Sequence, residues 1–216
     1  MENHSIIQGV YLVGGLRFHR DSSSFLEAIE HAFIGGIRLF QLRIKDELTD
    51  KEHLNLARQV RSLTRQYGVT YLINDRPDIA KLCDADGVHV GPDDLPASEI
   101  RKIIGNKIIG RSSHSWKQAE IALQESISYL SVGPVYGTDC KKVSDAMVGT
   151  ALVSEVMKQT NLPIVAIGGI TTKNMGPVRE IGVNCVGVIR DIMGSSDLCK
   201  ASRNYIGAFN ISGEKK

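Results

Sequence analysis

A segment with two basic side chains and one amide carries the charge needed to bind phosphate. Gln41, Arg43 and Lys45 alternate in the sequence QLRIK, and alternation places all three on one side of an extended chain. Arginine offers a planar fork of donors and lysine a compact charge, so together they suit a diphosphate. The alternatives are an interior polar layer or an ion pair with Asp46 or Glu47. We favour a ligand, because charges facing an apolar interior are costly.

Two further segments each supply a carboxylate. Asp75 lies in INDRP and Asp94 in GVHVGPDD. Two carboxylates that share a site repel each other unless a cation lies between them, and Mg²⁺ is typically held by one or two carboxylates together with phosphate oxygens and water. The alternative is helix capping, by Asn74 or Asp75 before one helix and by Asp93 or Asp94 before the next. The basic segment that precedes them favours the metal interpretation.

The segment GRSSHS supplies hydroxyl groups and an imidazole. Ser115 is expected to cap the helix that follows, which leaves Ser112 and His114 as candidates for ligand contact. His114 is also a candidate for proton transfer, because the pKa of imidazole lies near neutrality. We expect His89, between two valines, to be a hydrogen-bonded core histidine without a chemical role.

Three later segments predict further phosphate contacts. The long polar sequence GPVYGTDCKK is more often functional than idle, and Lys141 within it could reach a phosphate oxygen or remain a solvated lysine beside Lys142. AIGGI and VIRDI combine glycines with a possible helix start, a pattern that builds phosphate sites after the last two strands of eight-stranded barrels. Two anion sites, and therefore two phosphorylated small-molecule substrates, are implied.

These residues follow short β-branched runs that alternate with amphipathic segments such as Ser24–Phe33 and Lys51–Tyr67. The alternation predicts parallel strands joined by helices. Eight such units favour a closed (β/α)8 TIM barrel over an open doubly wound sheet, since Gly14-Gly15-Leu16 replaces the expected glycine-rich fingerprint. In a barrel, the βα loops carry function. The predicted strands are Val10–Val13, Ile37–Leu42, Val69–Ile73, Gly87–Val90, Lys107–Gly110, Tyr129–Val132, Ile164–Ile167 and Val186–Ile189.

Composition sets the remaining bounds. The 216 residues, 42% of them hydrophobic, fit one domain over 1–216, with a polar tail over 210–216 that we expect to fray. A net charge of +2 gives no field that would demand nucleic acid or a membrane. Four scattered cysteines, no signal-like start and no long apolar run predict a cytoplasmic protein. A homo-oligomer is compatible with the sequence and not required by it.

Taken together, QLRIK, IND, GVHVGPDD, GRSSH, GPVYGTDCKK, AIGGI and GVIRDI resemble, in order and spacing, the motifs of the thiamin phosphate synthase family. The resemblance spans Val10 to Ala208. It implies a (β/α)8 barrel that condenses hydroxymethylpyrimidine diphosphate with a thiazole phosphate and releases diphosphate with the help of Mg²⁺. The implied mechanism is dissociative: the leaving diphosphate is stabilised electrostatically, and the thiazole nitrogen captures the pyrimidine methyl cation.

The resemblance also implies roles for individual residues. The pyrimidine diphosphate contacts are Gln41, Arg43, Lys45, Asn74, Ser112 and Lys141, of which Arg43, Lys45, Ser112 and Lys141 are the catalytic set. The magnesium ligands are Asp75 and Asp94. The thiazole phosphate side comprises Thr138, Asp139, Cys140, Gly169, Ile189 and Arg190.

Four positions depart from the family pattern: Pro92 stands for a usual glutamine, Gly137 for a proline, Cys140 for a threonine and Arg190 for a frequent serine. A sister family, the thiazole tautomerases, has similar GRSxHS and TDCKK segments, and a histidine matching His114 moves a proton there. Tautomerases usually lack the full basic triplet and aspartate pair. A non-catalytic sensor of a thiamin precursor, and a generic barrel isomerase or epimerase, are further alternatives.

Overall fold

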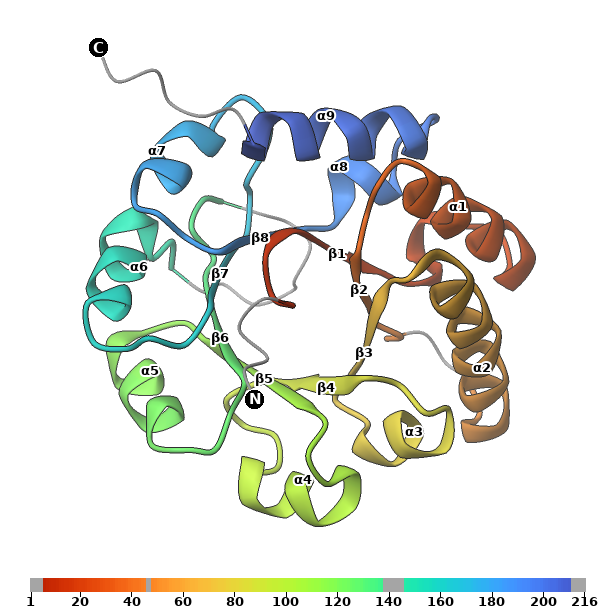
Figure 1. Ribbon diagram of the computed structural model, residues 1–216, viewed down its shortest axis with the longest axis horizontal. Helices are drawn as coiled ribbons and strands as arrows, with labels where there is room; N and C mark the ends of the chain where they lie inside the picture. The colour runs from red at the N-terminus through yellow and green to blue at the C-terminus, as the bar shows by residue number, and fades with distance from the viewer. Residues whose placement is uncertain (1–5, 46–47, 138–145, 211–216) are drawn as a thin grey trace.

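The computed structural model describes residues 6–45, 48–137 and 146–210, and within them eight parallel strands form a closed barrel (Figure 1). Each strand pairs with the next in the chain, and the last pairs with the first. The predicted (β/α)8 barrel is therefore confirmed, and the open sheet is excluded because it would have two unpaired edges. The strands are β1 (Gly9–Gly14), β2 (Leu39–Leu42), β3 (Thr70–Asn74), β4 (Gly87–Val90), β5 (Ile108–Ser113), β6 (Tyr129–Val132), β7 (Ile164–Ile167) and β8 (Cys185–Val188).

The predicted and observed strands agree closely, with two differences that affect the site. β5 continues to Ser113 and pairs with β6 through Ser112 and Ser113, so Ser112 lies within the barrel wall and not in a loop. β8 ends at Val188, one residue earlier than predicted, because Ile189 leaves the sheet as the N-cap of a short helix.

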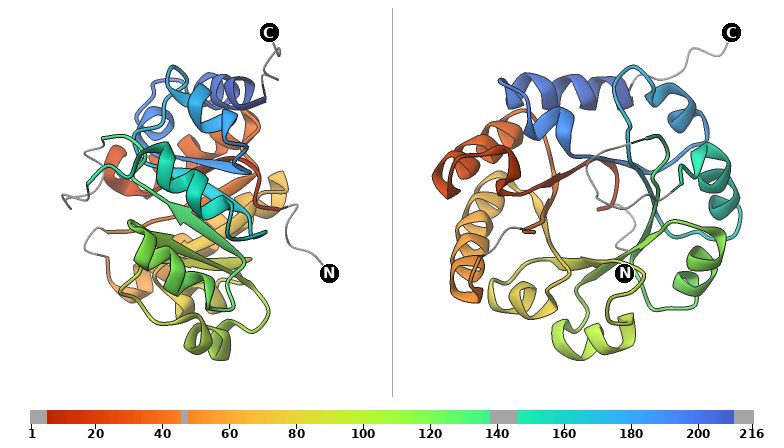
Figure 2. Two further views of the ribbon diagram at one scale, coloured as in Figure 1. Left: turned by 90° about the vertical axis from the view of Figure 1, so that its left-hand side faces the viewer. Right: turned by 180° about the vertical axis from the view of Figure 1, so that it is seen from behind.

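Helices surround the strands on the outside, as both panels of Figure 2 show. The described residues contain the 3-10 turn η2 (Leu16–Phe18) and the helices α1 (Ser22–Ile34), α2 (Asp50–Tyr67), α3 (Pro77–Leu82), α4 (Ala97–Ile104), α5 (Trp116–Leu123), α6 (Gly149–Met157), α7 (Met175–Glu180), α8 (Arg190–Met193) and α9 (Leu198–Asn210). Asn210, where we expected a polar tail to begin, is the last residue of α9, and 211–216 lie outside the described residues.

Local sequence signals fix where α2 begins and ends. The Thr49 hydroxyl accepts a hydrogen bond from the Glu52 amide, and the Glu52 carboxylate accepts one from the Thr49 amide, which makes a capping box. The helix ends at Gly68, whose φ of 63° is in the left-handed region that glycine adopts without strain. Ala57 and Val60 lie on its buried face, as the amphipathic pattern of this segment requires.

Two apolar layers make the core. The outer layer lies between strands and helices and includes Phe25, Ile29 and Phe33 of α1. The inner layer fills the barrel and includes Leu72, Val165 and the two tyrosines Tyr11 and Tyr129. A Cβ on Gly110 would overlap the Tyr129 ring, so this glycine makes room for the aromatic side chain of its partner on the neighbouring strand β6.

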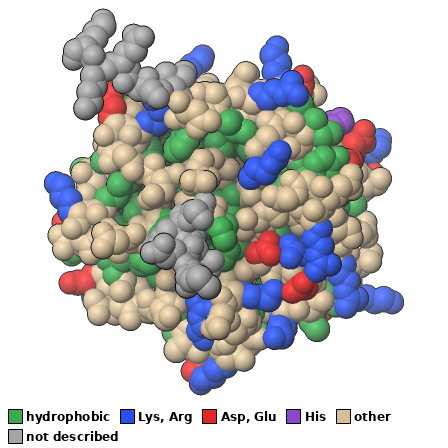
Figure 3. Space-filling view, viewed as in Figure 1, with side chains coloured by type: hydrophobic (Ala, Val, Ile, Leu, Met, Phe, Trp, Pro, Cys, Tyr) green, Lys and Arg blue, Asp and Glu red, His purple; other side chains and the backbone are tan. Residues whose placement is uncertain are grey.

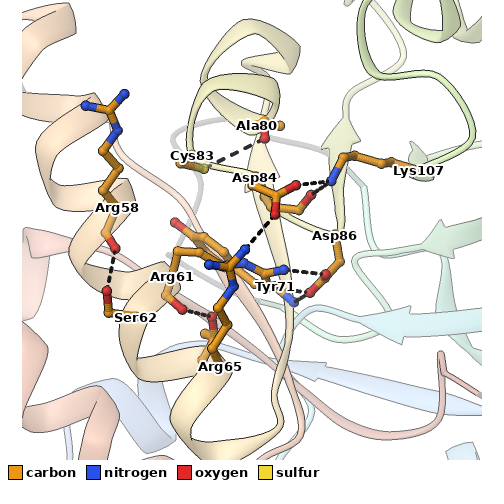
Figure 4. A network of polar contacts seen from close by, with 12 residues as sticks. Arg58, Arg61, Ser62, Arg65, Tyr71, Ala80, Cys83, Asp84, Asp86 and Lys107 are labelled. Carbon is orange, nitrogen blue, oxygen red and sulfur yellow. Dashed lines mark hydrogen bonds and ion pairs between the residues drawn. The ribbon is translucent and has the colours of Figure 1, made fainter.

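Ion pairs join the segments that lead into β3, β4 and β5, at the amino end of the barrel. The Arg61 guanidinium donates to both carboxylate oxygens of Asp86 at 2.9 Å, and Asp86 also accepts from the Tyr71 amide at 2.8 Å (Figure 4). Asp84 pairs with Arg65 at 2.6 Å and with Lys107 at 2.8 Å. Figure 3 shows basic and acidic side chains next to each other on this end of the barrel. We assign this cluster to stability, because barrel function belongs to the opposite end.

Candidate functional site

A cavity of about 480 Å³ opens at the carboxyl ends of the strands, and residues that follow β2, β3, β4, β5, β6, β7 and β8 line it. Most of the residues singled out from the sequence meet here: Gln41, Arg43, Lys45, Asn74, Asp75, Asp94, Ser112, His114, Gly169, Ile189 and Arg190 all line the cavity. Four predicted residues, Thr138, Asp139, Cys140 and Lys141, lie outside the described residues. Pro92 and Gly137, two of the departures from the family pattern, also line it.

The two aspartates reach the cavity from neighbouring loops. Asp75 has a left-handed backbone with a φ of 60°, and its amide donates to the His89 carbonyl of β4 at 2.9 Å. The Asp94 carboxylate accepts a hydrogen bond from the Gly91 amide at 2.6 Å. Neither aspartate caps a helix, because the N-cap positions of α3 and α4 are occupied by Arg76 and Pro96 without a side-chain cap. The helix-capping alternative is therefore wrong.

The electrostatics of this pair suit a cation. Burial raises the pKa of the Asp94 carboxyl above its ordinary value, and the Asp75 carboxylate beside it acts in the same direction. Within the part of the chain that the structure describes, no group of three or more His, Cys, Asp or Glu side chains is arranged to hold a metal ion. A cation at Asp75 and Asp94 would therefore complete its coordination with water or ligand oxygens.

The basic side chains stand beside the same aspartates. Lys45 Nζ, in the loop after β2, lies 2.5 Å from a carboxylate oxygen of Asp75, in the loop after β3. An ion pair does form, as one alternative for Lys45 proposed, but its described partner is Asp75; Asp46 and Glu47 lie outside the described residues. More than half of the Lys45 side chain is exposed, so it remains accessible to a ligand phosphate. Arg43 lines the cavity next to it.

A buried arginine that was not predicted from the sequence binds the backbone of the loop that carries Asp94. Arg111 of β5 is only 5% exposed, and its guanidinium donates to the carbonyls of Pro92 and Leu95 at 3.1 and 3.0 Å. Glu125 pairs with Arg111 at 3.3 Å and accepts from the Ala97 amide at 3.0 Å. Pro92 takes part through its carbonyl, so this contact does not depend on its side chain.

The orientation of His114 follows from its hydrogen bond to a carbonyl. Its Nδ1 lies 2.5 Å from the Gly133 carbonyl oxygen, and a carbonyl only accepts, so Nδ1 carries a proton. In the neutral imidazole, Nε2 is then the nitrogen without a proton. The His114 amide donates to the Gln118 side chain at 2.7 Å, and Ser115 caps α5 as predicted. These contacts hold the His114 ring in one orientation at the cavity wall.

Glycine turns after β7 form another part of the cavity wall. Gly168 and Gly169 follow β7 with φ of 99° and 64°, and a Cβ on Gly169 would approach the Gly137 carbonyl to 2.5 Å. Only glycine satisfies both the backbone conformation and this close approach. Ile189, the N-cap of α8, also lines the cavity. Turns of this kind after the last two strands bind phosphate in many barrels.

The cavity floor contains a polar cluster that the sequence did not predict. His89 is buried and hydrogen-bonded through both ring nitrogens, as expected for a core histidine, yet it also lines the cavity. Its partners include Tyr129, which contacts Tyr11 118 residues away in sequence. The sequence did contain a signal for this cluster. Side chains alternate along a strand, so Tyr129 and Ser131 of β6 lie on the same, inward face.

Comparison with known proteins agrees with this architecture. A family model described as thiamine monophosphate synthase matches residues 10–192. The chain belongs to the thiamine monophosphate synthase family. It is 38% identical over 200 residues to the thiamine-phosphate synthase of Shouchella clausii, covering 92% of this chain and 95% of that protein. It is 39% identical over 199 residues to that of Bacillus velezensis, covering 91% and 88%.

A solved structure supports the same assignment to the thiamine monophosphate synthase family. The thiamine phosphate pyrophosphorylase from Pyrococcus furiosus superposes with a TM-score of 0.85 at 30% sequence identity, covering 95% of this chain and 96% of that chain. The family resemblance stated from the sequence motifs is therefore confirmed.

Proposed function

We propose that this protein is a thiamine-phosphate synthase, which joins hydroxymethylpyrimidine diphosphate to a thiazole phosphate and releases diphosphate. The observation that carries the proposal is the presence of Arg43, Lys45, Asp75 and Asp94 around one cavity in a chain of this family. A diphosphate substrate requires that concentration of cations and cation ligands. The amide-lined turn at Gly169 would receive the phosphate of the thiazole.

Magnesium fits the donor set. Mg²⁺ prefers oxygen ligands such as these two carboxylates, and water and phosphate oxygens would supply the remaining ligands. We propose Asp75 and Asp94 as its ligands, since the mutual repulsion of these carboxylates is relieved by a cation. The bound ion would supply positive charge to the leaving diphosphate.

The proposed mechanism is dissociative. Arg43 and Lys45 would stabilise the charge that develops on diphosphate as the bond from oxygen to the pyrimidine methylene carbon breaks. Ser112 would donate a hydrogen bond to the same anion, and Gln41 and Asn74 would contact the pyrimidine. The thiazole nitrogen then donates its lone pair to the pyrimidine methyl cation, so no protein nucleophile is needed. Roles for Thr138, Asp139, Cys140 and Lys141 stay predictions from family resemblance.

The decisive experiment supplies both phosphorylated substrates to the purified protein, with and without Mg²⁺, and measures thiamin phosphate. We expect product only when the metal is present. Failure to form product from authentic substrates and Mg²⁺ would refute the proposal.

A second candidate, thiazole tautomerase activity, is favoured by one observation: the hydrogen bond from His114 Nδ1 to the Gly133 carbonyl, which orients the ring at the cavity wall. This activity would be independent of metal and abolished by His114→Ala. Conversely, thiamin phosphate synthesis should survive His114→Ala at a reduced rate, because the proposed mechanism assigns that residue no proton transfer. Assaying both reactions with the same variant separates the two candidates.

The proposed setting is a reducing cytoplasm. The described cysteines Cys83, Cys185 and Cys199 are free thiols, which agrees with a reducing compartment. No helix of the described residues is long and apolar enough to cross a membrane. The proposed partners are the phosphorylated small molecules alone, and a homo-oligomer remains compatible with the chain.

A further inference from the structure

Five side chains from five strands form one continuous chain of hydrogen bonds at the cavity floor. Gln41 Nε2 lies 2.6 Å from the Tyr11 hydroxyl, which lies 3.0 Å from the Tyr129 hydroxyl. Tyr129 in turn lies 2.8 Å from His89 Nδ1, and His89 Nε2 lies 2.8 Å from the Ser112 hydroxyl. The chain runs from β2 through β1, β6 and β4 to β5, and it ends at the cavity.

Burial forces these groups to satisfy one another. Tyr11 is 1% exposed, Tyr129 0%, Gln41 2% and His89 8%, so these polar groups are satisfied chiefly by one another. Burial also raises the pKa of both tyrosine hydroxyls far above their ordinary value, which keeps each hydroxyl neutral with one proton. Each tyrosine therefore has one hydrogen to donate along the chain.

The direction of donation follows from the first member. An amide nitrogen only donates, so Gln41 Nε2 gives a hydrogen bond to the Tyr11 oxygen. Tyr129 is the other hydrogen-bond partner of the Tyr11 hydroxyl among the described residues, so we infer that Tyr11 donates to Tyr129 and that Tyr129 donates to His89 Nδ1.

The same rule fixes the state of the histidine. Because Nδ1 accepts, neutral His89 carries its proton on Nε2 and donates it to the Ser112 oxygen. The Ser112 oxygen already accepts a hydrogen bond from the protein, so its own proton is left for another acceptor. Ser112 lines the cavity.

We propose that this chain is a positioning device: Tyr11, Tyr129 and His89 fix the Ser112 hydroxyl as a hydrogen-bond donor into the cavity. This inference deepens the proposed function, on which the identity of the acceptor as a diphosphate oxygen rests. A donor held in place stabilises the anion as charge develops on it. With the opposite polarity, Ser112 would donate to His89 and offer only lone pairs to the anion.

A double-mutant cycle tests the energetic link. Tyr129→Phe removes the proton that holds His89 Nδ1 as an acceptor and frees the ring to reverse, so we expect kcat to fall about tenfold with KM within about twofold. In a Ser112→Ala background the same change should alter kcat less than about twofold, because the hydroxyl that it orients is gone. Equal losses in both backgrounds would overturn the proposal.

Tyr71→Phe is the matched control. Tyr71 is also fully buried in the barrel wall, but its hydroxyl donates to the Ala57 carbonyl at 3.2 Å and is not a member of the chain. This variant also loses a buried tyrosine hydroxyl, so it measures how much the loss of such a hydroxyl affects folding. We expect kcat close to that of the unmodified protein. A loss as large as that of Tyr129→Phe would assign the effect to folding and contradict the proposal.

A spectroscopic measurement is independent of activity and is made on the unmodified protein, with a variant needed only to assign the signals. Long-range ¹H–¹⁵N correlation on the ¹⁵N-labelled protein distinguishes the protonated ring nitrogen of His89 from the other, with the signals assigned by comparison with His89→Gln. We expect the proton on Nε2, and a proton on Nδ1 would overturn the proposal. If Nε2 is protonated but no thiamin phosphate forms, the proposed function fails while the hydrogen-bond polarity stands.

Discussion

Two aspartates with the same backbone conformation face opposite ends of the barrel. Asp75 and Asp84 both have a left-handed backbone, with φ of 60° and 55°, and both pair with a lysine, Lys45 and Lys107 respectively. Asp75 faces the cavity at the carboxyl end of the barrel, whereas Asp84 lies in the ion-pair cluster at the amino end. A comparison of the two separates a role in the reaction from a role in local structure.

Asp75→Asn should lower kcat about a hundredfold or more at saturating substrates and Mg²⁺. Asparagine keeps the shape of the side chain and tolerates the left-handed backbone, so the change removes chiefly the negative charge. Asp84→Asn is the control and should leave kcat within about twofold. Steady-state kinetics on both variants checks this, and an Asp75→Asn enzyme of normal rate would remove Asp75 from the metal site.

At the scale of elements, one carboxylate connects α2 with two strands. Asp86, directly before β4, accepts two hydrogen bonds from the Arg61 guanidinium of α2 and a third from the Tyr71 amide of β3 (Figure 4). The Arg61 side chain is 14% exposed, and its Nε is buried without a partner among the described atoms. Removing Asp86 would therefore leave a largely buried guanidinium unpaired.

Asp86→Ala should lower the free energy of unfolding by about 2 to 3 kcal/mol, because it breaks hydrogen bonds to a charged group and leaves its partner unsatisfied. Asp84→Ala, whose side chain is 59% exposed, should cost about 1 kcal/mol or less. Chemical denaturation of both variants measures the difference. Equal costs would show that the Arg61 pair is no more important to folding than a surface ion pair.

At the scale of the whole molecule, two histidines that are buried or partly buried make the free energy of unfolding depend on pH. Burial lowers the pKa of His53 in α2, and the nearby Arg76 charge acts in the same direction. Burial also lowers the pKa of His19. Below the ordinary histidine pKa of 6.5, the unfolded chain binds protons that the folded chain does not. Stability is therefore fully present above that pH and declines as pH falls toward the folded pKa values.

We accordingly expect the free energy of unfolding to decrease between pH 7 and pH 5, and to decrease less in His53→Gln. His31→Gln, at an exposed position of α1, serves as the control and should retain the full decrease. Urea denaturation across this pH range provides the measurement. If His53→Gln shows the same pH dependence as the unmodified protein, His53 does not contribute to it.

The sequence by itself determined the barrel and most of its rim. Eight alternating strand and helix patterns are local signals, and once they close into a barrel every strand must present its following residues at one end. That rule was enough to bring Arg43, Lys45, Asp75 and Asp94 to one cavity. The identity of the substrates came from the order of the motifs, and it agrees with membership in the thiamine monophosphate synthase family.

Only the tertiary structure decided which side chains touch across the barrel. Three sets of contacts join residues that are distant in sequence. They are the ion pair of Lys45 with Asp75, the hydrogen bonds of Arg111 to the loop that carries Asp94, and the hydrogen-bonded chain from Gln41 to Ser112. Such contacts depend on strand register and on which side chains point inward, and a one-residue shift would reverse them. Periodicity identifies each strand, but the partner that it meets inside is set by closure of the whole barrel.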